Sequence, residues 1–319
     1  MRVDEGDFIH LRPMQALVYA IVYSLLWLLA WLPLRLQFVI SDLLYMLVYH
    51  VFTYRKKVVR QNIARSFPEK DEAWRRKVER KFYRHFCDSF FEWMYPLHRS
   101  AEELQKHYRI ANPEVINELH ARGKSVAGVL GHYGNWEWLS LLPLEVKHKV
   151  WAIYKPIKNP YFDRLINGLR SKFGVLMVPD REAFKTLMAE GQAGEKTLTY
   201  FLADQSPQAH KIRYRTEFLN QDSPVFLGAE QIASKLDMAV VFFDIRKVSR
   251  GHYELHFELL CEHPRELPQY AVTELHVRAL EKAIKRDPAW WLWSHRRWKH
   301  SREQHRDTEV DASRRDGPK

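Results

Sequence analysis

Five short apolar segments after residue 125 constrain the fold of this chain more than any other feature. SVAGVL, VWAIY, VLMV, TLTYFLA and AVVFFDI are rich in β-branched and aromatic residues, as buried strands are. Helical stretches separate most of them. One begins at Asn159 and Pro160, a favourable cap and first-turn pair, and ends before Gly174. This alternation predicts an α/β fold, with a mixed, largely parallel sheet flanked by helices.

An uncharged apolar run near the N-terminus predicts a transmembrane helix. No charged residue occurs from Pro13 to Leu34, and a helix needs about 20 apolar residues to cross a hydrocarbon core. The run lacks the basic opening and cleavage site of a signal peptide, which indicates a retained anchor. The alternative is a buried helix of a soluble protein. A second apolar stretch, Leu36 to Phe52, contains one acid, Asp42, and fits a re-entrant, interfacial or first core helix.

The charge distribution predicts both a partner and an orientation. A formal net charge of +11 favours a polyanionic partner such as nucleic acid, an anionic membrane surface or an acidic protein. The basic segment YRKKVVR directly follows the apolar region, so the bulk of the chain should be cytoplasmic. We therefore expect a membrane anchor with a second apolar helix in residues 1–53, a cytoplasmic domain in 54–300 and a polar tail in 301–319.

A long helix is predicted between these regions, because one apolar residue recurs at every fourth position. The stripe consists of Trp74, Val78, Phe82, Phe86, Phe90 and Met94. The other faces carry many cations, among them Arg75, Arg76 and Arg80. A solvated basic face and contact with anionic membrane lipids both explain them.

Metal and disulfide chemistry receive little support from the sequence. The two cysteines exclude a disulfide framework, and Cys87 falls in the helical stripe, where a core position is favoured. His252, Glu254, His256 and Glu258 alternate with apolar residues. This pattern fits a metal site or a half-exposed edge strand, and we favour the edge strand. We expect no metal.

The segment GHYGNWEW, residues 131–138, carries the best candidate for a catalytic pair. His132 directly follows a predicted strand, at the end of the sheet where open α/β folds place their chemistry. Asn135 can cap the next helix, whose first turn holds Glu137. If the loop folds back, Glu137 can orient the imidazole, leaving its other nitrogen to take a proton from a hydroxyl. The alternative is a structural turn histidine and an acid that favours the helix dipole.

The spacing from His132 to Glu137 resembles the first motif of the glycerolipid acyltransferase superfamily. More closely, the chain resembles the bacterial lipid A late acyltransferases, which add secondary acyl chains to a lipid A precursor. The resemblance extends from the apolar N-terminal run to about Trp298. It rests on the order and spacing of RQNIARSFPE, YKPIKNPYFDRLINGLRSKFG, FLADQSP, EFLNQDSPVFLGAEQIA and WLWSHRRWK. One departure is Leu219-Asn220, where the family often has an aromatic-Gly pair.

The resemblance implies a membrane-bound O-acyltransferase of the bacterial inner membrane, with residues 54–300 as its cytoplasmic acyltransferase domain. The donor would be a fatty acyl thioester on acyl carrier protein, the acceptor a hydroxyl of a lipid A precursor, and no cofactor would be needed. His132 would act as general base, oriented by Glu137. Arg170 would bind phosphate or support the developing oxyanion. Further candidates for substrate binding are Asp204, Gln205 and Asn135.

Two alternatives stay open at this point. The same catalytic pair could serve another lipid acceptor, such as a glycerolipid, a mannolipid, an aminolipid or a pigment. A membrane-anchored nucleic-acid-binding protein is a different class, suggested by the net charge and by the segment WWLWSHRRWKH. Because no nucleic-acid-binding motif occurs, we expect no nucleic-acid partner.

Overall fold

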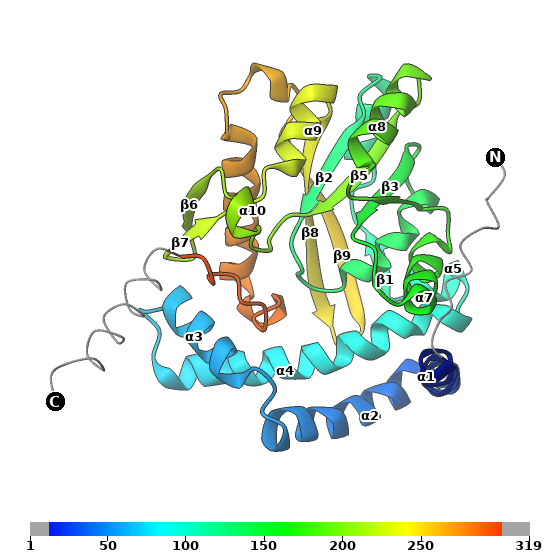
Figure 1. The fold of residues 1–319 in the computed structure, drawn as a ribbon, viewed down its shortest axis with the longest axis vertical. Coiled ribbons are helices and arrows are strands. Elements are labelled where there is room, and N and C mark those ends of the chain that lie inside the picture. The colour runs from blue at the N-terminus through cyan, green and yellow to red at the C-terminus, as the bar shows by residue number, and fades with distance from the viewer. Residues whose placement is uncertain (1–12, 302–319) are drawn as a thin grey trace, which may run out of the picture.

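The computed structural model describes residues 13–301, and its centre is a seven-stranded sheet. The strand order is β1-β9-β8-β2-β5-β3-β4, and β6 and β7 form a separate two-stranded sheet (Figure 1). All neighbours in the large sheet are parallel except β8 and β9. The predicted mixed, largely parallel α/β fold is thereby confirmed.

All five apolar segments that predicted the fold are strands of the large sheet, namely β2, β3, β4, β5 and β8. The strands are β1 (Tyr108–Ile110), β2 (Val126–Leu130), β3 (Lys149–Tyr154), β4 (Leu176–Pro179), β5 (Thr197–Leu202), β6 (Arg215–Phe218), β7 (Gln221–Pro224), β8 (Ala239–Ser249) and β9 (His252–Cys261).

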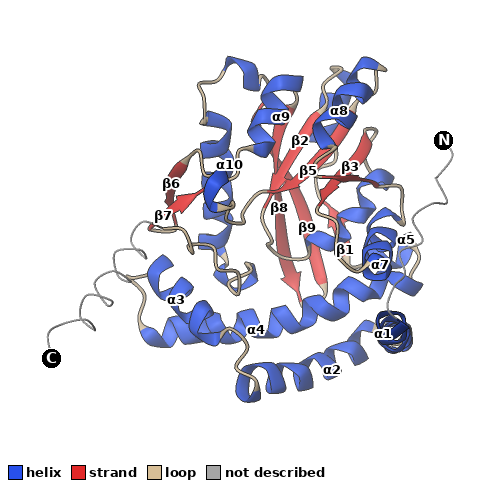
Figure 2. Ribbon diagram, in the orientation of Figure 1, coloured by secondary structure: helices blue, strands red, loops and turns tan. Residues whose placement is uncertain are grey.

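Helices lie on both sides of the sheet, as Figure 2 shows. The α-helices are α1 (Pro13–Trp31), α2 (Leu34–Met46), α3 (Lys56–Ser66), α4 (Glu72–Met94), α5 (Ala101–Gln105), α6 (Glu114–Ala121), α7 (Pro160–Ser171), α8 (Ala183–Gln192), α9 (Gly228–Leu236) and α10 (Ala271–Arg286). A π-helix, η1 (Leu47–Val51), extends α2, and 3-10 helices form η2 (Tyr95–His98), η3 (Trp136–Leu144), η4 (Ala209–Lys211), η5 (Pro264–Glu266) and η6 (Pro288–Trp290). The side chain of Asn159 caps α7, as predicted.

Alternate residues of the central strands enter two separate cores. Val129 of β2 and Phe242 of β8 pack into a core that includes residues of α4, α9 and α10. Val126 and Val241 belong to a second core that includes residues of α6 and η3. The central strands therefore read as continuous apolar runs, because both of their faces are buried.

The predicted long helix is α4, which lies along one end of the sheet (Figure 1). Val78, Phe82 and Met94 of the apolar stripe are buried in the core. Phe86 and Phe90 are not, since a four-residue spacing drifts around a helix of 3.6 residues per turn. These two side chains line a cavity instead. Cys87 is buried in the core, as predicted.

The N-terminal apolar region forms two successive helices. The first helix, α1, ends at Trp31, and α2 begins at Leu34, directly after Pro33. Within residues 13–301, the helix that is long and apolar enough to cross a membrane is Leu34–Val51, in the second apolar stretch. Figure 1 shows α1 end-on beside the start of α2, which runs along α4. Both helices expose large apolar side chains, including Leu25, Leu28, Val39 and Leu43.

Three other sequence predictions have separate outcomes. The strand that begins at His252, β9, is half-exposed as predicted but is not an edge strand, because the short strand β1 pairs with it. Among residues 13–301, no cluster of three or more His, Cys, Asp or Glu side chains could hold a metal ion. The polar tail predicted for 301–319 lies, apart from Ser301, outside the described residues.

The Trp-rich and Arg-rich segment near the C-terminus belongs to the core. Trp291, Trp293, Arg297 and Trp298 are each at most 2% exposed. These side chains are not available as a platform for nucleic-acid bases or as a membrane interface. The segment therefore no longer supports the nucleic-acid-binding alternative, which is left with the net charge alone.

Candidate active site

The loop between β2 and η3 places His132 at the carboxyl end of the sheet. Two glycines allow its tight path. A Cβ atom on Gly131 would lie 2.9 Å from the methyl groups of Leu280, and Gly134 has a φ of +63°. Tyr133, between them, forms a bridge with Trp291. The loop is thus fastened to the segment that follows α10.

Asp204, at the end of the neighbouring strand, holds the imidazole of His132. The Oδ1 atom lies 2.6 Å from Nδ1 of His132, while Oδ2 accepts the backbone N–H of His132 at 2.8 Å. Oδ2 also accepts the indole N–H of Trp291 at 2.8 Å. The carboxylate is buried, so these contacts fix its position. It selects the tautomer in which Nδ1 carries the proton and Nε2 is the free base.

Glu137 makes a different contact from the predicted one. It accepts two hydrogen bonds from Arg170 on α7, from Nε at 2.9 Å and from Nη2 at 2.7 Å. The guanidinium also lies 5.0 Å from the centre of the Trp136 ring. The structure therefore assigns the orientation of His132 to Asp204, and it joins Glu137 and Arg170 in an ion pair beside the histidine.

The remaining predicted residues both contact this site. Nε2 of Gln205 lies 3.3 Å from Nε2 of His132, so its amide donates to the basic nitrogen. The side chain of Asn135 accepts the backbone N–H of Trp138 and thus caps η3, as predicted. Its amide nitrogen lies 3.4 Å from Oε2 of the buried Glu92. Asn135 holds the loop in shape, whereas Gln205 contacts the nitrogen of His132 that Asp204 leaves unprotonated.

The electrostatics of the pair suit a general base. Burial acts to lower the pKa of His132, but the Asp204 carboxylate outweighs it, and the net pKa is raised above its ordinary value. Burial alone would raise the pKa of Asp204. The neighbouring His132 nevertheless holds the pKa of Asp204 well below its usual range. The carboxylate thus stays ionised over the whole range in which the imidazole titrates.

An apolar cavity of about 360 Å³ leads from His132 toward the N-terminal helices. His132 and Glu137 line it together with many apolar side chains, which include Leu44, Val48, Phe86, Phe90 and Trp93. Phe90 is 44% exposed, so the cavity reaches the surface beside α2. Its shape and lining fit an alkyl chain, with the reacting group at the histidine.

Comparison with known proteins agrees with this geometry. The family model described as bacterial lipid A biosynthesis acyltransferase matches residues 7–300 of the chain. The chain belongs to the bacterial lipid A biosynthesis acyltransferase family. This membership confirms the resemblance in the sequence and the prediction of an O-acyltransferase, and it implies a lipid A precursor as acceptor.

Named relatives of this acyltransferase are distant but match along most of their length. A lipid A biosynthesis lauroyltransferase of Escherichia coli (strain K12) is 22% identical over 251 residues, covering 77% of this chain and 79% of the relative. A lipid A biosynthesis acyltransferase of Haemophilus influenzae (strain ATCC 51907 / DSM 11121 / KW20 / Rd) is 24% identical over 225 residues, covering 70% of each.

Sequence reasoning missed two parts of the acyltransferase site. Trp291 was read only as part of an aromatic segment, yet its indole N–H fixes Asp204. Glu92 lies in the last turn of α4 and is buried, and its carboxylate accepts the hydroxyl of Tyr253 at 2.8 Å. Burial raises the pKa of Glu92 to about 7. The sequence did contain an indication of Glu92, because an acidic residue flanked by aromatic residues on a predicted core helix is unusual.

Proposed function

We propose that this enzyme transfers a fatty acyl group from the thioester of acyl carrier protein to a hydroxyl of a lipid A precursor. The observation that carries the proposal is the His132–Asp204 pair together with the apolar cavity that His132 lines. An acid-oriented imidazole activates a hydroxyl, and the apolar cavity receives an alkyl chain. The carrier protein as donor follows from the family resemblance, and the acceptor follows from family membership.

The reaction assigned to the site is a direct acyl transfer. The acceptor hydroxyl replaces Gln205 at Nε2 of His132, which removes its proton as the oxygen attacks the thioester carbonyl. The tetrahedral intermediate then collapses, the C–S bond breaks, and the imidazolium returns the proton to the departing thiolate. Asp204 stabilises the imidazolium throughout. The Arg170 guanidinium remains the candidate for support of the oxyanion.

Membrane attachment is the second part of the proposal. The exposed apolar side chains of α1 and α2 would contact lipid, because soluble monomers rarely expose contiguous apolar patches of this kind. They include Leu17, Ile21, Leu25 and Leu28 on α1, Leu36, Val39 and Leu43 on α2, and Leu47 on η1. The mouth of the cavity at Phe90 would then face the membrane. We propose the cytoplasmic side of the bacterial inner membrane, because the basic segment 54–60 directly follows these helices.

The experiment that tests the proposal is a transfer assay with the purified, detergent-solubilised protein. A lipid A precursor is offered with acyl carrier protein thioesters and, separately, with coenzyme A thioesters of the same chain, and the products are weighed by mass spectrometry. The expected product is the precursor plus one acyl group, formed faster from the carrier protein thioester. A product formed only on a glycerolipid acceptor would contradict the proposed acceptor. Equal rates from both thioesters would contradict the proposed donor.

A further inference from the structure

A second cavity of about 290 Å³ lies beside the reaction cavity, and it is cationic. Its lining includes four basic side chains, Lys81, Arg84, Lys247 and Arg250, against one carboxylate, Asp88. The two cavities share a wall, because His85 and Trp290 line both of them. A molecule whose reacting end lies near His132 can therefore place an anionic group in the second cavity.

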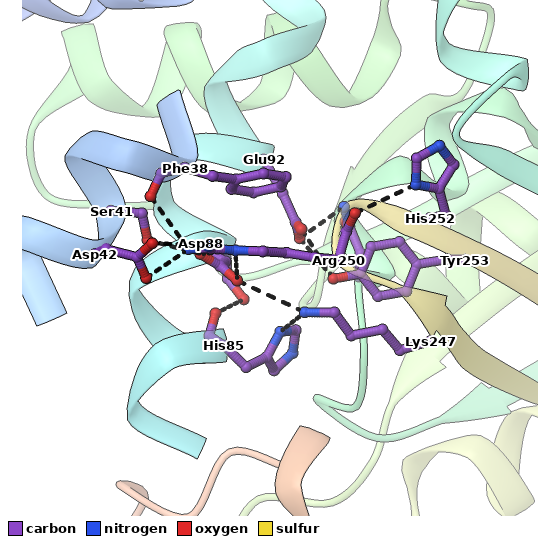
Figure 3. A network of polar contacts seen from close by, with 12 residues as sticks. Phe38, Ser41, Asp42, His85, Asp88, Glu92, Lys247, Arg250, His252 and Tyr253 are labelled. Carbon is purple, nitrogen blue, oxygen red and sulfur yellow. Dashed lines mark hydrogen bonds and ion pairs between the residues drawn. The ribbon is translucent and has the colours of Figure 1, made fainter. Parts of the chain in front are cut away.

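The inner half of this cavity, formed by Lys247, His85 and Asp88, is held together by contacts among its own side chains. Nζ of Lys247 lies 3.2 Å from Nδ1 of His85 and 3.8 Å from Oδ2 of Asp88, and 4.7 Å from the centre of the Trp290 ring. Figure 3 shows Lys247 and Arg250 converging on Asp88 from the β8–β9 hairpin. Burial lowers the pKa of His85 well below its ordinary value, and Lys247 lowers it further, so the ring accepts from Lys247 and adds no charge.

Arg250 joins the cavity to the N-terminal helices. It donates to Asp88 at 2.7 Å and to both carboxylate oxygens of Asp42 on α2, at 2.9 and 3.0 Å (Figure 3). Its other partner is the backbone carbonyl of Phe38. These contacts fasten α2 to the sheet and leave Arg250 partly neutralised. The free positive charge of the cavity comes mainly from its outer half.

The outer half consists of Lys81 and Arg84, which project from α4. Both side chains are exposed, and neither has a carboxylate partner among residues 13–301. The Arg84 guanidinium lies 5.3 Å from the ring of Tyr45 on α2, next to the exposed apolar face of that helix. Under the proposed membrane attachment, both cations lie at the level of lipid headgroups.

We infer that this cationic cavity binds a phosphate group, and, resting on the proposed function, that the phosphate belongs to the lipid acceptor. Arg and Lys suit phosphate because they offer several charge-assisted donors to its oxygens. The shared wall favours the acceptor over other sources, since the acceptor must also reach His132. The cavity thus selects phosphorylated glycolipids over neutral ones. Bulk phospholipid headgroups and the phosphate of the acyl donor are the other sources of the same chemistry.

The test compares Lys81→Gln/Arg84→Gln with the control Lys57→Gln/Lys77→Gln. Lys57 and Lys77 are exposed cations on α3 and α4 that line neither cavity. Transfer is measured in neutral detergent micelles with a phosphorylated acceptor and with the same acceptor after phosphatase treatment. We expect the first variant to raise the acceptor KM roughly tenfold, corresponding to the loss of about one charge-assisted contact. Its kcat and its donor KM should stay at the wild-type values.

Removing the phosphate from the acceptor should raise the wild-type KM by a similar factor and abolish the difference between wild type and variant. A difference that persists on the phosphate-free acceptor would overturn the inference. So would a raised donor KM, which would assign the phosphate to the donor. If the control variant raised the acceptor KM as much as Lys81→Gln/Arg84→Gln, the cations would act on bulk lipid headgroups instead. The same conclusion would follow if Lys81→Gln/Arg84→Gln lost affinity for phosphatidylcholine vesicles containing phosphatidic acid by the factor it loses for the acceptor.

A binding measurement separates this inference from the proposed function. Tryptophan fluorescence is followed as the phosphorylated acceptor is added without donor, because Trp290 lies in the shared wall. If the wild-type protein showed no acyl transfer but Lys81→Gln/Arg84→Gln still bound the phosphorylated acceptor more weakly than wild type, the phosphate site would be supported and the proposed function would fail. Normal transfer with unchanged acceptor affinity in this variant would overturn the phosphate site alone.

Discussion

Nδ1 of His132 and Oδ1 of Asp204 lie 2.6 Å apart, although 72 residues separate them in the chain. Each residue follows a strand, and the two strands, β2 and β5, are parallel neighbours whose last paired residues are Leu130 and Leu202. The shared edge of the sheet therefore brings them together. This contact fixes which ring nitrogen of His132 is basic.

Asp204→Asn should lower the rate and shift its pH dependence. The pKa of His132 is raised because Asp204 outweighs the opposing effect of burial. A general base works unprotonated, so kcat/KM should rise with pH through this raised pKa. Without the Asp204 carboxylate, burial becomes the dominant influence on the pKa of His132, and the rising limb should move to lower pH while the maximum falls by roughly 10²–10⁴-fold. Measuring kcat/KM of both proteins from pH 5 to 9 checks this prediction. If the rising limb of Asp204→Asn lay at the wild-type pH, Asp204 would not set the pKa of His132.

Glu137 and Arg170 should behave as a unit. Their side chains are 17% and 21% exposed, so Glu137→Gln leaves a largely buried guanidinium without its counter-ion. Each single variant, Glu137→Gln or Arg170→Gln, should lose stability by about 1–3 kcal/mol. The double variant should be less destabilised than the sum of the two. Chemical denaturation of all four proteins gives the coupling energy, and strict additivity would mean that the pair contributes nothing in solution.

Gly131→Ala should destabilise the protein and disturb the site. The added Cβ would lie 2.9 Å from two methyl carbons of Leu280 and 3.1 Å from Oδ2 of Asp204. Overpacking of this kind costs about 1–3 kcal/mol. Gly191→Ala is the matched control, since no atom lies within 4 Å of its Cβ and it occupies the helix α8. The control should be neutral or stabilising by up to about 1 kcal/mol. Equal melting temperatures for the two variants would contradict the crowding at Gly131.

Val48→Trp should shorten the acyl chain that the enzyme accepts. Val48 lines the apolar part of the cavity, and a larger side chain there reduces its depth. Val51→Trp is the control, because Val51 is 65% exposed and does not line the cavity. Competition among thioesters of different chain length, read by product mass, should show a shift toward shorter chains in Val48→Trp only. The same preference in both variants would exclude this cavity as the chain site.

The sequence predicted the parts of the molecule that depend on local patterns. Buried strands are continuous apolar runs, and the caps at Asn135 and Asn159 are local side-chain contacts, so both were readable. The long helix was readable as well. Phe86 and Phe90, which line the cavity, were assigned to the same face as the core residues. The four-residue pattern does not show at which residue the stripe has rotated out of the core.

The partner of His132 could not be read from spacing. Glu137 is five positions away, but η3 begins at Trp136 and turns its carboxylate toward α7 and Arg170. Asp204 becomes the neighbour only through the order of strands in the sheet, which the apolar segments alone do not give. The strand β1 pairs with β9, but its three residues are too few to show a strand pattern in the sequence.

The most direct measurement of the central claim is acyl transfer by His132→Ala, with thermal unfolding of the same preparation. His132 is the only residue to which the account assigns removal of the acceptor proton, and a positioned base contributes typically roughly 10²–10⁴-fold. The account predicts that His132→Ala remains folded at the assay temperature and loses transfer by at least about a hundredfold. A folded His132→Ala protein with near wild-type transfer would contradict it.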